Sequence, residues 1–228
     1  ENTKVLYLES PSSLTFRIQD LAACAKLAKK YKLVSIIDNS FASPIFQQPA
    51  KFGIDLVVHS GTKYINGHSD VVLGVVCGST EKIFQVFNTE QMTLGSILSP
   101  HDAALAIRGL RTLPLRMKRV AESALEIARF LEKHDKVEKV IHPMLSSFPQ
   151  FDLAQQQMSG AGGLFSVYFR AESLVQMEAF IHRFKRFLIA VSWGGHESLI
   201  MPVAGFYQIE GRANSELPWT LIRFSIGL

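Results

Sequence analysis

Four short, mostly apolar runs in the first part of the chain predict β-strands over residues 5–8, 33–37, 54–58 and 71–77. Apolar residues at helical spacing lie between the first two runs. They predict a helix over residues 21–31, with Asp20 as its N-cap. Strands that are apolar throughout and alternate with helices are typical of a parallel sheet covered by helices on both faces.

The pattern changes at residue 102, where helical spacing begins and continues to residue 134. Gly109 and Pro114 interrupt this stretch, so the sequence predicts two helices or one kinked helix. Residues 164–169 alternate like a strand of an open sheet, residues 174–184 predict a helix, and residues 221–226 predict a last strand. We therefore expect an α/β unit and a smaller α+β unit, joined by a long helical connector.

The 228 residues are 47% hydrophobic and 19% charged, which is an ordinary balance for a globular protein with a sizeable core. The net charge of +4 is spread along the chain. Its densest basic group, residues 108–119, is interleaved with Leu and Met as on one face of a helix. This distribution argues against a nucleic-acid partner. No apolar run reaches the length of a membrane span, so no membrane partner is expected.

Cys24 and Cys77 do not form a Cys-x-x-Cys pair, which favours a reduced, cytoplasmic setting. The seven histidines show neither His-x-x-x-His nor His-Glu-x-x-His spacing, so no metal site is expected. Strand-like runs lie at both ends of the chain, from which we expect a piece of a longer protein.

The segment from Asp55 to Asp70 combines the end of a predicted strand with reactive side chains. Its apolar run stops at Ser60, and Thr62 and Lys63 follow closely. A lysine amine can form a covalent Schiff base with an aldehyde cofactor, and the two hydroxyls can donate hydrogen bonds to a phosphate. Most lysines are solvated, but one removed from water loses its proton more readily and can serve as nucleophile and base.

Asp38 ends another predicted strand, at the position where open parallel sheets place ligand sites. An aspartate there can simply cap a turn. It can also stay ionised by facing a cation, such as the protonated ring nitrogen of pyridoxal phosphate. The 25 residues from Asp38 to Lys63 allow one crossover between neighbouring parallel strands. Both side chains are therefore expected at the same edge of the sheet.

Ser60-Gly-Thr-Lys63 also matches Ser-x-x-Lys, the nucleophile motif of penicillin-binding proteins and serine β-lactamases. Those enzymes need Ser-Asp-Asn and Lys-Thr-Gly elements as well. This chain has Ser69-Asp70-Val71 and no Lys-Thr-Gly, so a serine hydrolase is a weak alternative.

A last polar cluster combines Ser192 and Trp193 with Arg223, which lies inside an otherwise apolar run. Such an arginine can bury its stem at the edge of a sheet. Alternatively, its planar fork can bind a carboxylate. The Ser192 hydroxyl and the Trp193 indole would then supply further donors to that carboxylate.

Together these residues resemble the cysteine and methionine metabolism family of pyridoxal-phosphate enzymes. That family includes cystathionine β-lyase, cystathionine γ-synthase, cystathionine γ-lyase and methionine γ-lyase. The resemblance covers essentially the whole chain. Residues 60–70 are similar to the family's cofactor-lysine signature and residues 38–44 to its Asp-Asn-Thr-Phe segment. Residues 108–113, 192–199 and 221–227 match later landmarks in the right order.

The resemblance implies roles in cofactor binding for four residues. Lys63 would hold pyridoxal 5'-phosphate covalently and move the substrate's Cα proton. Asp38 would pair with the pyridinium nitrogen, which keeps the ring able to accept electrons. Ser60 and Thr62 would bind the phosphate.

It also implies roles in binding the amino-acid substrate. Ser192, Trp193 and Arg223 would hold the α-carboxylate. Ser13 stands where the family often has an asparagine that contacts cofactor and substrate. This substitution, with Trp193 after Ser192 and Gly163-Leu-Phe-Ser166, favours the β-lyase branch.

The implied architecture is α/β, the fold-type I arrangement of aspartate aminotransferase-like enzymes. Residues 1–112 would form the C-terminal part of the large cofactor-binding domain, with a mostly parallel sheet. Residues 113–228 would form the small α+β domain without its last helix. The family's N-terminal portion, which completes a neighbouring subunit's site, would lie outside these residues. We expect a homo-oligomer, a dimer of dimers.

The expected reaction is α,β-elimination from cystathionine or a related cysteine S-conjugate, as used in transsulfuration and methionine biosynthesis. It would release a thiol, pyruvate and ammonia. Cystathionine γ-synthase, cystathionine γ-lyase or methionine γ-lyase activity is the alternative within the family. An inactive fragment or non-catalytic relative is the alternative of another class.

Overall fold

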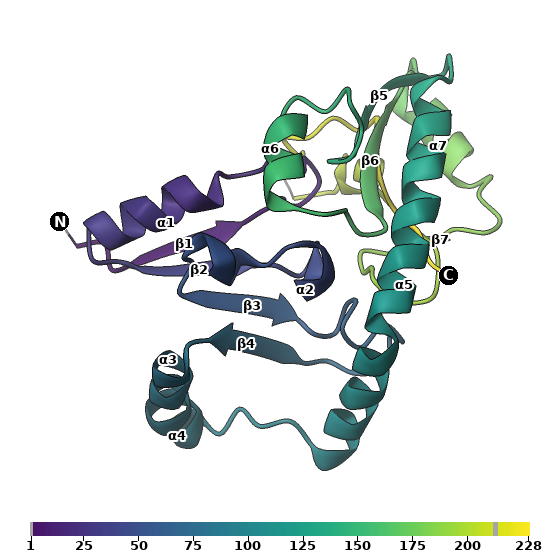
Figure 1. Cartoon of the computed structure of the whole chain (residues 1–228). Helices are drawn as coiled ribbons and strands as arrows, with labels where there is room; N and C mark the ends of the chain where they lie inside the picture. Colours follow the sequence, from purple (N-terminus) through teal and green to yellow (C-terminus); the bar gives the residue numbers. More distant parts are fainter. Residues whose placement is uncertain (1, 212–213) are drawn as a thin grey trace.

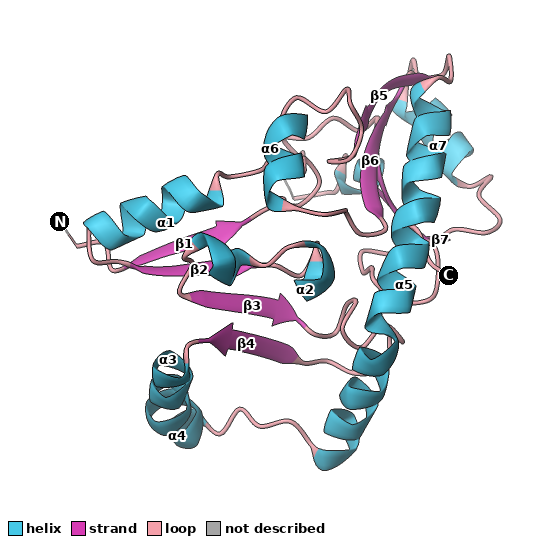
Figure 2. Cartoon of the chain, in the orientation of Figure 1, coloured by secondary structure: helices cyan, strands magenta, loops and turns pink. Residues whose placement is uncertain are grey.

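The structure, a computed structural model, describes residues 2–211 and 214–228. Two β-sheets are connected by one long helix, α5 (Pro100–Glu132), which runs along one side of the molecule (Figure 1). The first sheet has the strand order β1-β2-β3-β4, and the second has the order β5-β6-β9-β8-β7. The α/β unit and the second, α+β unit expected from the sequence are both present (Figure 2).

Three strands of the first sheet are parallel: β1 (Val5–Glu9), β2 (Val34–Asp38) and β3 (Leu56–Ser60). β4 (Gly74–Gly78) pairs antiparallel with β3. Asp38 lies opposite Glu9 on one side and Val58 on the other. The carboxyl ends of the parallel strands therefore meet at one edge, which confirms the placement expected for Asp38 and the segment after Ser60.

Helix α1 (Leu21–Lys30) covers one face of this sheet. Asp20 caps it as predicted, because its side chain accepts a hydrogen bond from the backbone N–H of Ala23 at 2.9 Å. The helix and the sheet share one apolar cluster, whose buried members are Leu8, Leu21, Ala25, Ile37, Ile54 and Val57.

The opposite face of the first sheet is less buried than predicted. Val5 and Tyr7 are 46% and 58% exposed. Successive side chains of a strand point to opposite faces, and α1 covers only the face of Leu6 and Leu8. The prediction of a sheet covered by helices on both faces is therefore wrong for β1.

Helix α5 is a single helix that contains both Gly109 and Pro114, so the alternative of two helices is wrong. Ser99 caps it by accepting a hydrogen bond from the backbone N–H of Asp102 at 3.1 Å. Pro114 removes one backbone donor from the helix. Tertiary packing of the buried residues on both sides of this position holds the helix together. The predicted domain boundary at 112/113 falls inside α5, so the division remains a prediction.

Several short elements follow β2 and β4, and the hydrophobic pattern did not predict them. The two after β2 are too short to show a helical period, and the three after β4 follow one another without a break. Their bounds are α2 (Ser43–Phe46), the 3-10 helix η1 (Pro49–Phe52), α3 (Thr80–Gln85), the π-helix η2 (Val86–Gln91) and α4 (Met92–Leu94).

The second sheet packs on the C-terminal half of α5. Its strands are β5 (Val137–Ile141), β6 (Leu164–Phe169), β7 (Leu188–Ile189), β8 (Leu199–Pro202) and β9 (Leu221–Ser225). β6 has the predicted bounds, and β9 ends one residue early. The remaining elements are α6 (Phe151–Gln157), α7 (Leu174–Ile181) and the 3-10 helix η3 (Val203–Phe206). Phe165 and Phe224 stack at the centre of this core, with ring centroids 5.2 Å apart.

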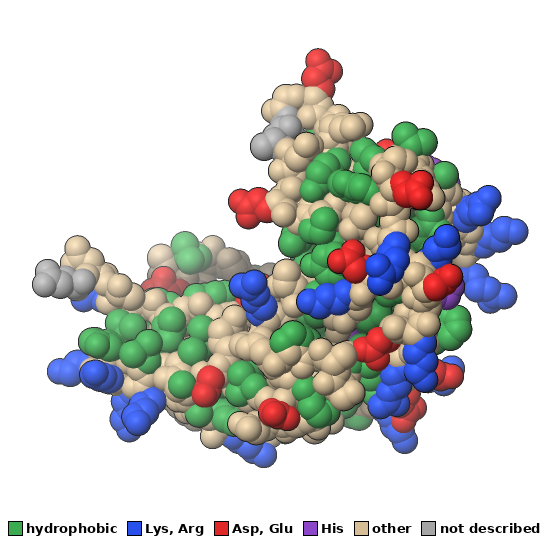
Figure 3. Space-filling view, turned by 90° about the horizontal axis from the view of Figure 1, so that it is seen from above, with side chains coloured by type: hydrophobic (Ala, Val, Ile, Leu, Met, Phe, Trp, Pro, Cys, Tyr) green, Lys and Arg blue, Asp and Glu red, His purple; other side chains and the backbone are tan. Residues whose placement is uncertain are grey.

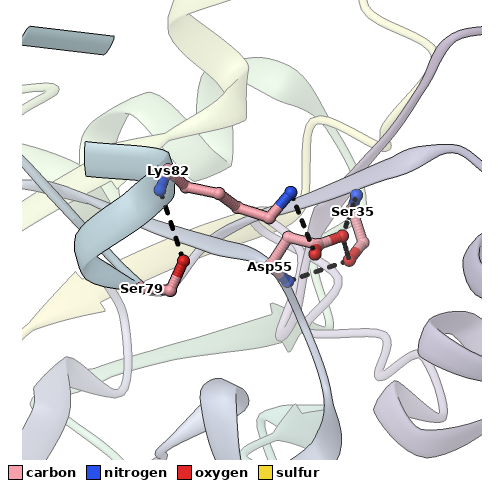
Figure 4. Close-up of polar contacts among 4 residues, drawn as sticks. All are labelled: Ser35, Asp55, Ser79 and Lys82. Atoms are coloured by element: carbon pink, nitrogen blue, oxygen red, sulfur yellow. Dashed lines mark hydrogen bonds and ion pairs between the residues drawn. The ribbon is translucent and has the colours of Figure 1, made fainter. Parts of the chain in front are cut away.

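A polar cluster fixes the amino end of β3, away from the carboxyl edge (Figure 4). The Asp55 carboxylate accepts hydrogen bonds from the backbone N–H (2.9 Å) and hydroxyl (2.8 Å) of Ser35. Lys82 approaches the same carboxylate at 3.3 Å. Burial alone would raise the pKa of Asp55, but the Ser35 hydrogen bonds and the Lys82 charge hold it below its usual value. This cluster ties β2, β3 and α3 together.

The surface shows no single-sign stripe on the side seen in Figure 3, where Lys and Arg side chains occur with Asp and Glu between them. Within residues 2–211 and 214–228, no helix combines the length and apolar character needed to cross a bilayer. Cys24 and Cys77 both have free thiols.

His142 lies in the core beside Phe165 and is 1% exposed. Its Nδ1 accepts the backbone N–H of Met144 at 3.0 Å. Burial, helped by the nearby charge of Arg129, lowers the pKa of His142 from 6.5 to about 4. The unfolded chain therefore binds a proton first as the pH falls. The free energy of unfolding therefore keeps its full value above pH 6.5 and falls by about 3 kcal/mol as the pH drops towards 4.

We expect His142→Asn, which keeps an acceptor near the position of Nδ1, to flatten this acid dependence. Urea unfolding from pH 7 to pH 4 measures it. The exposed His101→Asn variant should keep the wild-type slope. If the His142→Asn variant kept the wild-type slope, His142 would not be the source of the acid dependence, whatever the absolute stability of the variant.

Candidate functional site

A helical turn directly after β3 carries Lys63. Its backbone hydrogen bonds run from Lys63 N–H to the Ser60 carbonyl (3.1 Å), from Asn66 N–H to the Gly61 carbonyl (2.9 Å) and from Gly67 N–H to the Lys63 carbonyl (2.7 Å). The turn starts where the parallel strand ends, so the carboxyl edge of the sheet determines where Lys63 lies.

The Lys63 amine faces the second unit of the chain. Its Nζ donates a hydrogen bond to the Ser192 hydroxyl at 2.8 Å and lies 5.5 Å from the centre of the Trp193 ring. Burial, and then the positive charge of Arg223, lower the pKa of Lys63. A larger fraction of its amine is therefore neutral at a given pH, which is what a nucleophile or base requires.

Asp38 and Ser60 are linked through Ser40. The Asp38 carboxylate accepts the backbone N–H of Ser40 at 2.8 Å. The backbone N–H of Ser60 in turn donates to the Ser40 hydroxyl at 2.6 Å. This chain of bonds joins the ends of β2 and β3. It fixes the positions of the two predicted cofactor residues relative to each other.

A buried amide network supports the same edge from behind. Asn39 donates to the carbonyls of Ser43 (3.2 Å) and Gln47 (2.9 Å). Gln47 donates to the Asn39 side chain at 3.0 Å and to the Ser10 carbonyl at 2.8 Å. Every donor bond of this network ties the segment after β2 in place, although the Gln47 Oε1 has no partner within the described residues.

One cavity of about 70 Å³ brings most of the predicted residues together. Its lining includes Ser13, Asp38, Ser60, Trp193 and Arg223, and also Ser40. These residues come from both ends of the sequence and from both sheets. The fold therefore groups these five predicted residues, whereas Lys63, Thr62 and Ser192 do not line this cavity.

Arg223 lies on β9 with 8% of its surface exposed. Its Nη2 donates to the carbonyls of Val191 (2.6 Å) and Ser192 (3.3 Å). Its Nε is buried and has no partner within the described part of the chain. A guanidinium that is held through one nitrogen and has an unpaired donor on another suits a carboxylate ligand.

Two predicted residues make contacts within the protein that compete with their expected roles. The Ser13 hydroxyl donates to the Glu9 carboxylate at 2.8 Å. The Thr62 hydroxyl donates to the Leu73 carbonyl at 3.3 Å and accepts the Leu73 N–H at 2.9 Å. Each of these hydroxyls would have to exchange a bond to reach a ligand.

The sequence did not point to Tyr64, whose side chain contacts the glycine-rich segment 160–163. Its side chain is 3% exposed, and its hydroxyl accepts the backbone N–H of Gly163 at 2.6 Å. A Cβ at Gly162 would lie 2.6 Å from the same hydroxyl. The signal was the glycine-rich segment 160–163, where a close approach of side chain to backbone requires residues without a Cβ.

Metal chemistry finds no support in this part of the fold. Among residues 2–211 and 214–228, no group of three His, Cys, Asp or Glu side chains is placed to hold a metal ion.

The donor set fits pyridoxal phosphate. Lys63 has an amine with a lowered pKa, Asp38 offers an anion at the strand edge, and Ser60 offers a hydroxyl. The unpartnered Nε of Arg223 offers a donor for an amino-acid carboxylate. Lys63, Asp38 and Ser60 would hold the cofactor, and Arg223 would hold the substrate.

Comparison with known proteins also indicates a pyridoxal-phosphate enzyme, over the full length of the chain. Residues 1–228 match the model of a family described as Cys/Met metabolism PLP-dependent enzyme. A cystathionine β-lyase of Coxiella burnetii is 40% identical, with 99% of this chain and 59% of that protein aligned. An L-alanine/L-glutamate racemase of Wolbachia pipientis is 38% identical, with 100% and 56% aligned.

A solved structure has the same fold. The crystal structure of cystathionine γ-lyase from Lactobacillus plantarum, complexed with L-serine, superposes with a TM-score of 0.89 at 38% identity. The match covers 99% of this chain and 60% of that chain. The chain thus spans somewhat less than two thirds of the length of the proteins that it resembles.

Proposed function

Because this chain belongs to the Cys/Met metabolism PLP-dependent enzyme family, we propose that the protein is a carbon–sulfur lyase of amino-acid metabolism. The proposed reaction is α,β-elimination from cystathionine or a related cysteine S-conjugate, which consumes water and yields a thiol, pyruvate and ammonia. The single observation that carries the proposal is the Lys63 amine. It donates a hydrogen bond to the Ser192 hydroxyl at 2.8 Å, and burial together with the charge of Arg223 lowers its pKa.

When bound, pyridoxal phosphate supplies a conjugated ring that takes up the electron pair released at the substrate Cα. The residues of this chain provide the binding and the proton transfer. Asp38 keeps a negative charge at the strand edge for the ring nitrogen, and Ser60 donates to phosphate oxygens. Arg223 orients the α-carboxylate through Nε. The Lys63 amine attaches the cofactor and then removes the Cα proton as a general base.

Relatives of similar identity are named for different reactions, so the substrate has to be determined by product analysis. We expect the full-length protein with pyridoxal phosphate to convert cystathionine into homocysteine and pyruvate, identified by mass spectrometry. Cysteine with 2-oxobutyrate would instead assign γ-elimination. Conversion of L-alanine to D-alanine without thiol release would assign racemisation, the activity in the name of the Wolbachia relative.

A non-catalytic role is tested by cofactor binding. We expect titration with pyridoxal phosphate to give a tight complex that borohydride reduction makes permanent, since reduction fixes a lysine-bound aldehyde. Absence of any such complex would support an inactive or purely interacting protein and would overturn the proposal.

Three further features are proposed on the same basis. The assembly is a homo-oligomer, a dimer of dimers, which analytical ultracentrifugation of the full-length protein would test. The setting is cytoplasmic, in keeping with two free thiols. The large domain ends at residue 112 and the small domain begins at residue 113, within α5.

A further inference from the structure

Arg116 is a buried arginine on α5, 7% exposed, that binds the turn carrying Lys63. Its Nη1 donates to the Tyr64 carbonyl at 2.7 Å, and its Nη2 donates to the Ile65 carbonyl at 3.2 Å. The same Nη2 also reaches the Gly109 carbonyl at 2.8 Å, and Nε reaches the Thr112 hydroxyl at 3.0 Å. Within the residues that the structure describes, Arg116 forms no ion pair with a carboxylate.

Neither the Tyr64 nor the Ile65 carbonyl has a hydrogen-bond partner inside the turn. The hydrogen bonds inside the turn use the carbonyls of Ser60, Gly61 and Lys63. The last carbonyls of a helical segment have no partner within it and carry partial negative charge. Arg116 therefore acts as the C-terminal cap of the Lys63 turn, supplied from α5 by a residue 52 positions after Tyr64.

The turn, the helix and the guanidinium pack closely around this cap. A Cβ at Gly67, where φ is +73°, would lie 2.0 Å from Nη1. A Cβ at Gly109 would lie 2.2 Å from the Asn66 carbonyl oxygen. The turn and the helix thus touch backbone to backbone, and Arg116 fills the remaining space.

Burying a guanidinium without a counter-ion is costly, and burial lowers the pKa of Arg116. The four oxygen atoms that accept hydrogen bonds from Arg116 are placed around its planar guanidinium group. A lysine at this position would offer a point charge on a flexible stem and could not satisfy the same acceptors together.

We propose that Arg116 is a positioning residue for Lys63: its guanidinium holds the Lys63 turn against α5, and this fixes where the Lys63 amine lies. The inference rests on the proposed function of Lys63. Arg116 does not touch the amine, and its effect on the reaction is exerted through the backbone of Tyr64 and Ile65.

The test compares Arg116→Lys with the wild type in the cofactor-free, full-length protein, by hydrogen exchange of backbone amides. We expect the amides of Asn66 and Gly67 to exchange at least about tenfold faster in the variant. Amides of α5 beyond Val120 should keep their wild-type rates. With cofactor, kcat should fall about 10- to 100-fold while KM changes little, because a displaced amine costs rate more than binding.

A second readout follows the Lys63 amine itself by its rate of acylation in trace labelling. We expect the midpoint of its pH–rate profile to move upward in Arg116→Lys, because a loosened turn exposes the amine to water. The exposed Arg119→Lys, one turn further along α5, is the matched control and should match the wild type in every measurement.

Thr112→Val provides a milder variant if Arg116→Lys fails to fold, since it removes the acceptor for Nε and, with it, only the hydroxyl's own hydrogen bond to the Gly109 carbonyl (3.2 Å). It should give the same changes at a smaller size, about two- to fivefold. Unchanged exchange and acylation in these variants would overturn the proposal, and so would faster exchange spread evenly over α5. Exchange and acylation do not depend on turnover, so a failure of the proposed lyase activity would leave them readable.

Discussion

Lys63→Ala is expected to lose at least about a thousandfold in lyase activity and all covalently bound cofactor. The amine is the group that attaches the cofactor and moves the Cα proton, and none of the residues that line the cavity of Asp38 and Arg223 is a lysine that could replace it. Pyridoxal phosphate would then bind only through its polar contacts. The measurements are turnover of cystathionine, and the visible absorbance and borohydride trapping of the lysine-bound cofactor in the full-length protein.

The fold of this variant should stay intact. The Lys63 side chain donates one hydrogen bond to Ser192 and leaves part of its surface exposed, so its removal costs little stability. Lys51→Ala, at an exposed position before β3, is the matched control and should keep full activity and trapping. A Lys63→Ala protein that still traps the cofactor would show that another amine carries it.

Local sequence signals were sufficient to predict that Asp38 and Ser60 lie at the ends of neighbouring strands. Asp38 and Ser60 each end an apolar run, and the parallel pairing of β2 and β3 follows from runs of that length with a crossover between them. The cap of α1 at Asp20 was equally local, since one side chain and a nearby backbone N–H determine it.

The contacts that complete the site could not be predicted, because they join residues far apart in sequence. Lys63 meets Ser192 across 129 positions, and Arg116 meets the carbonyl of Tyr64 across 52. In the sequence, Arg116 looked like one more cation on a helix face. Only the close approach of α5 to the Lys63 turn, which needs Gly109, shows that this cation points inward.

Errors about burial and helix breaks have a related cause. An apolar run predicts a strand, but it does not tell whether both faces are covered, and β1 lies at an edge with Val5 and Tyr7 exposed. Pro114 predicts a break from local geometry. The packing of Leu113 and Met117, which are almost fully buried, outweighs that preference in α5.

Gly109→Ala is expected to destabilise the protein by about 3 kcal/mol, although alanine favours a helix over glycine by about 1 kcal/mol. The added Cβ would lie 2.2 Å from the Asn66 carbonyl oxygen and 2.9 Å from its carbonyl carbon. These are backbone atoms, so α5 and the Lys63 turn must move apart, and the hydrogen bonds of Arg116 to that turn would lengthen. For a chain of this size we expect a fall of Tm of about 10 °C by calorimetry.

The control for this prediction is Gly205→Ala, in η3, where a new Cβ would meet nothing within 4 Å. That variant should unfold within about 0.5 kcal/mol of the wild type. A Gly109→Ala protein as stable as the control would mean that the turn can move away from α5 at little cost. The close contact would then not be what holds Lys63 in place. A large loss confined to Gly109→Ala would instead show that the absence of a single Cβ on the connecting helix allows the lysine turn to pack against it.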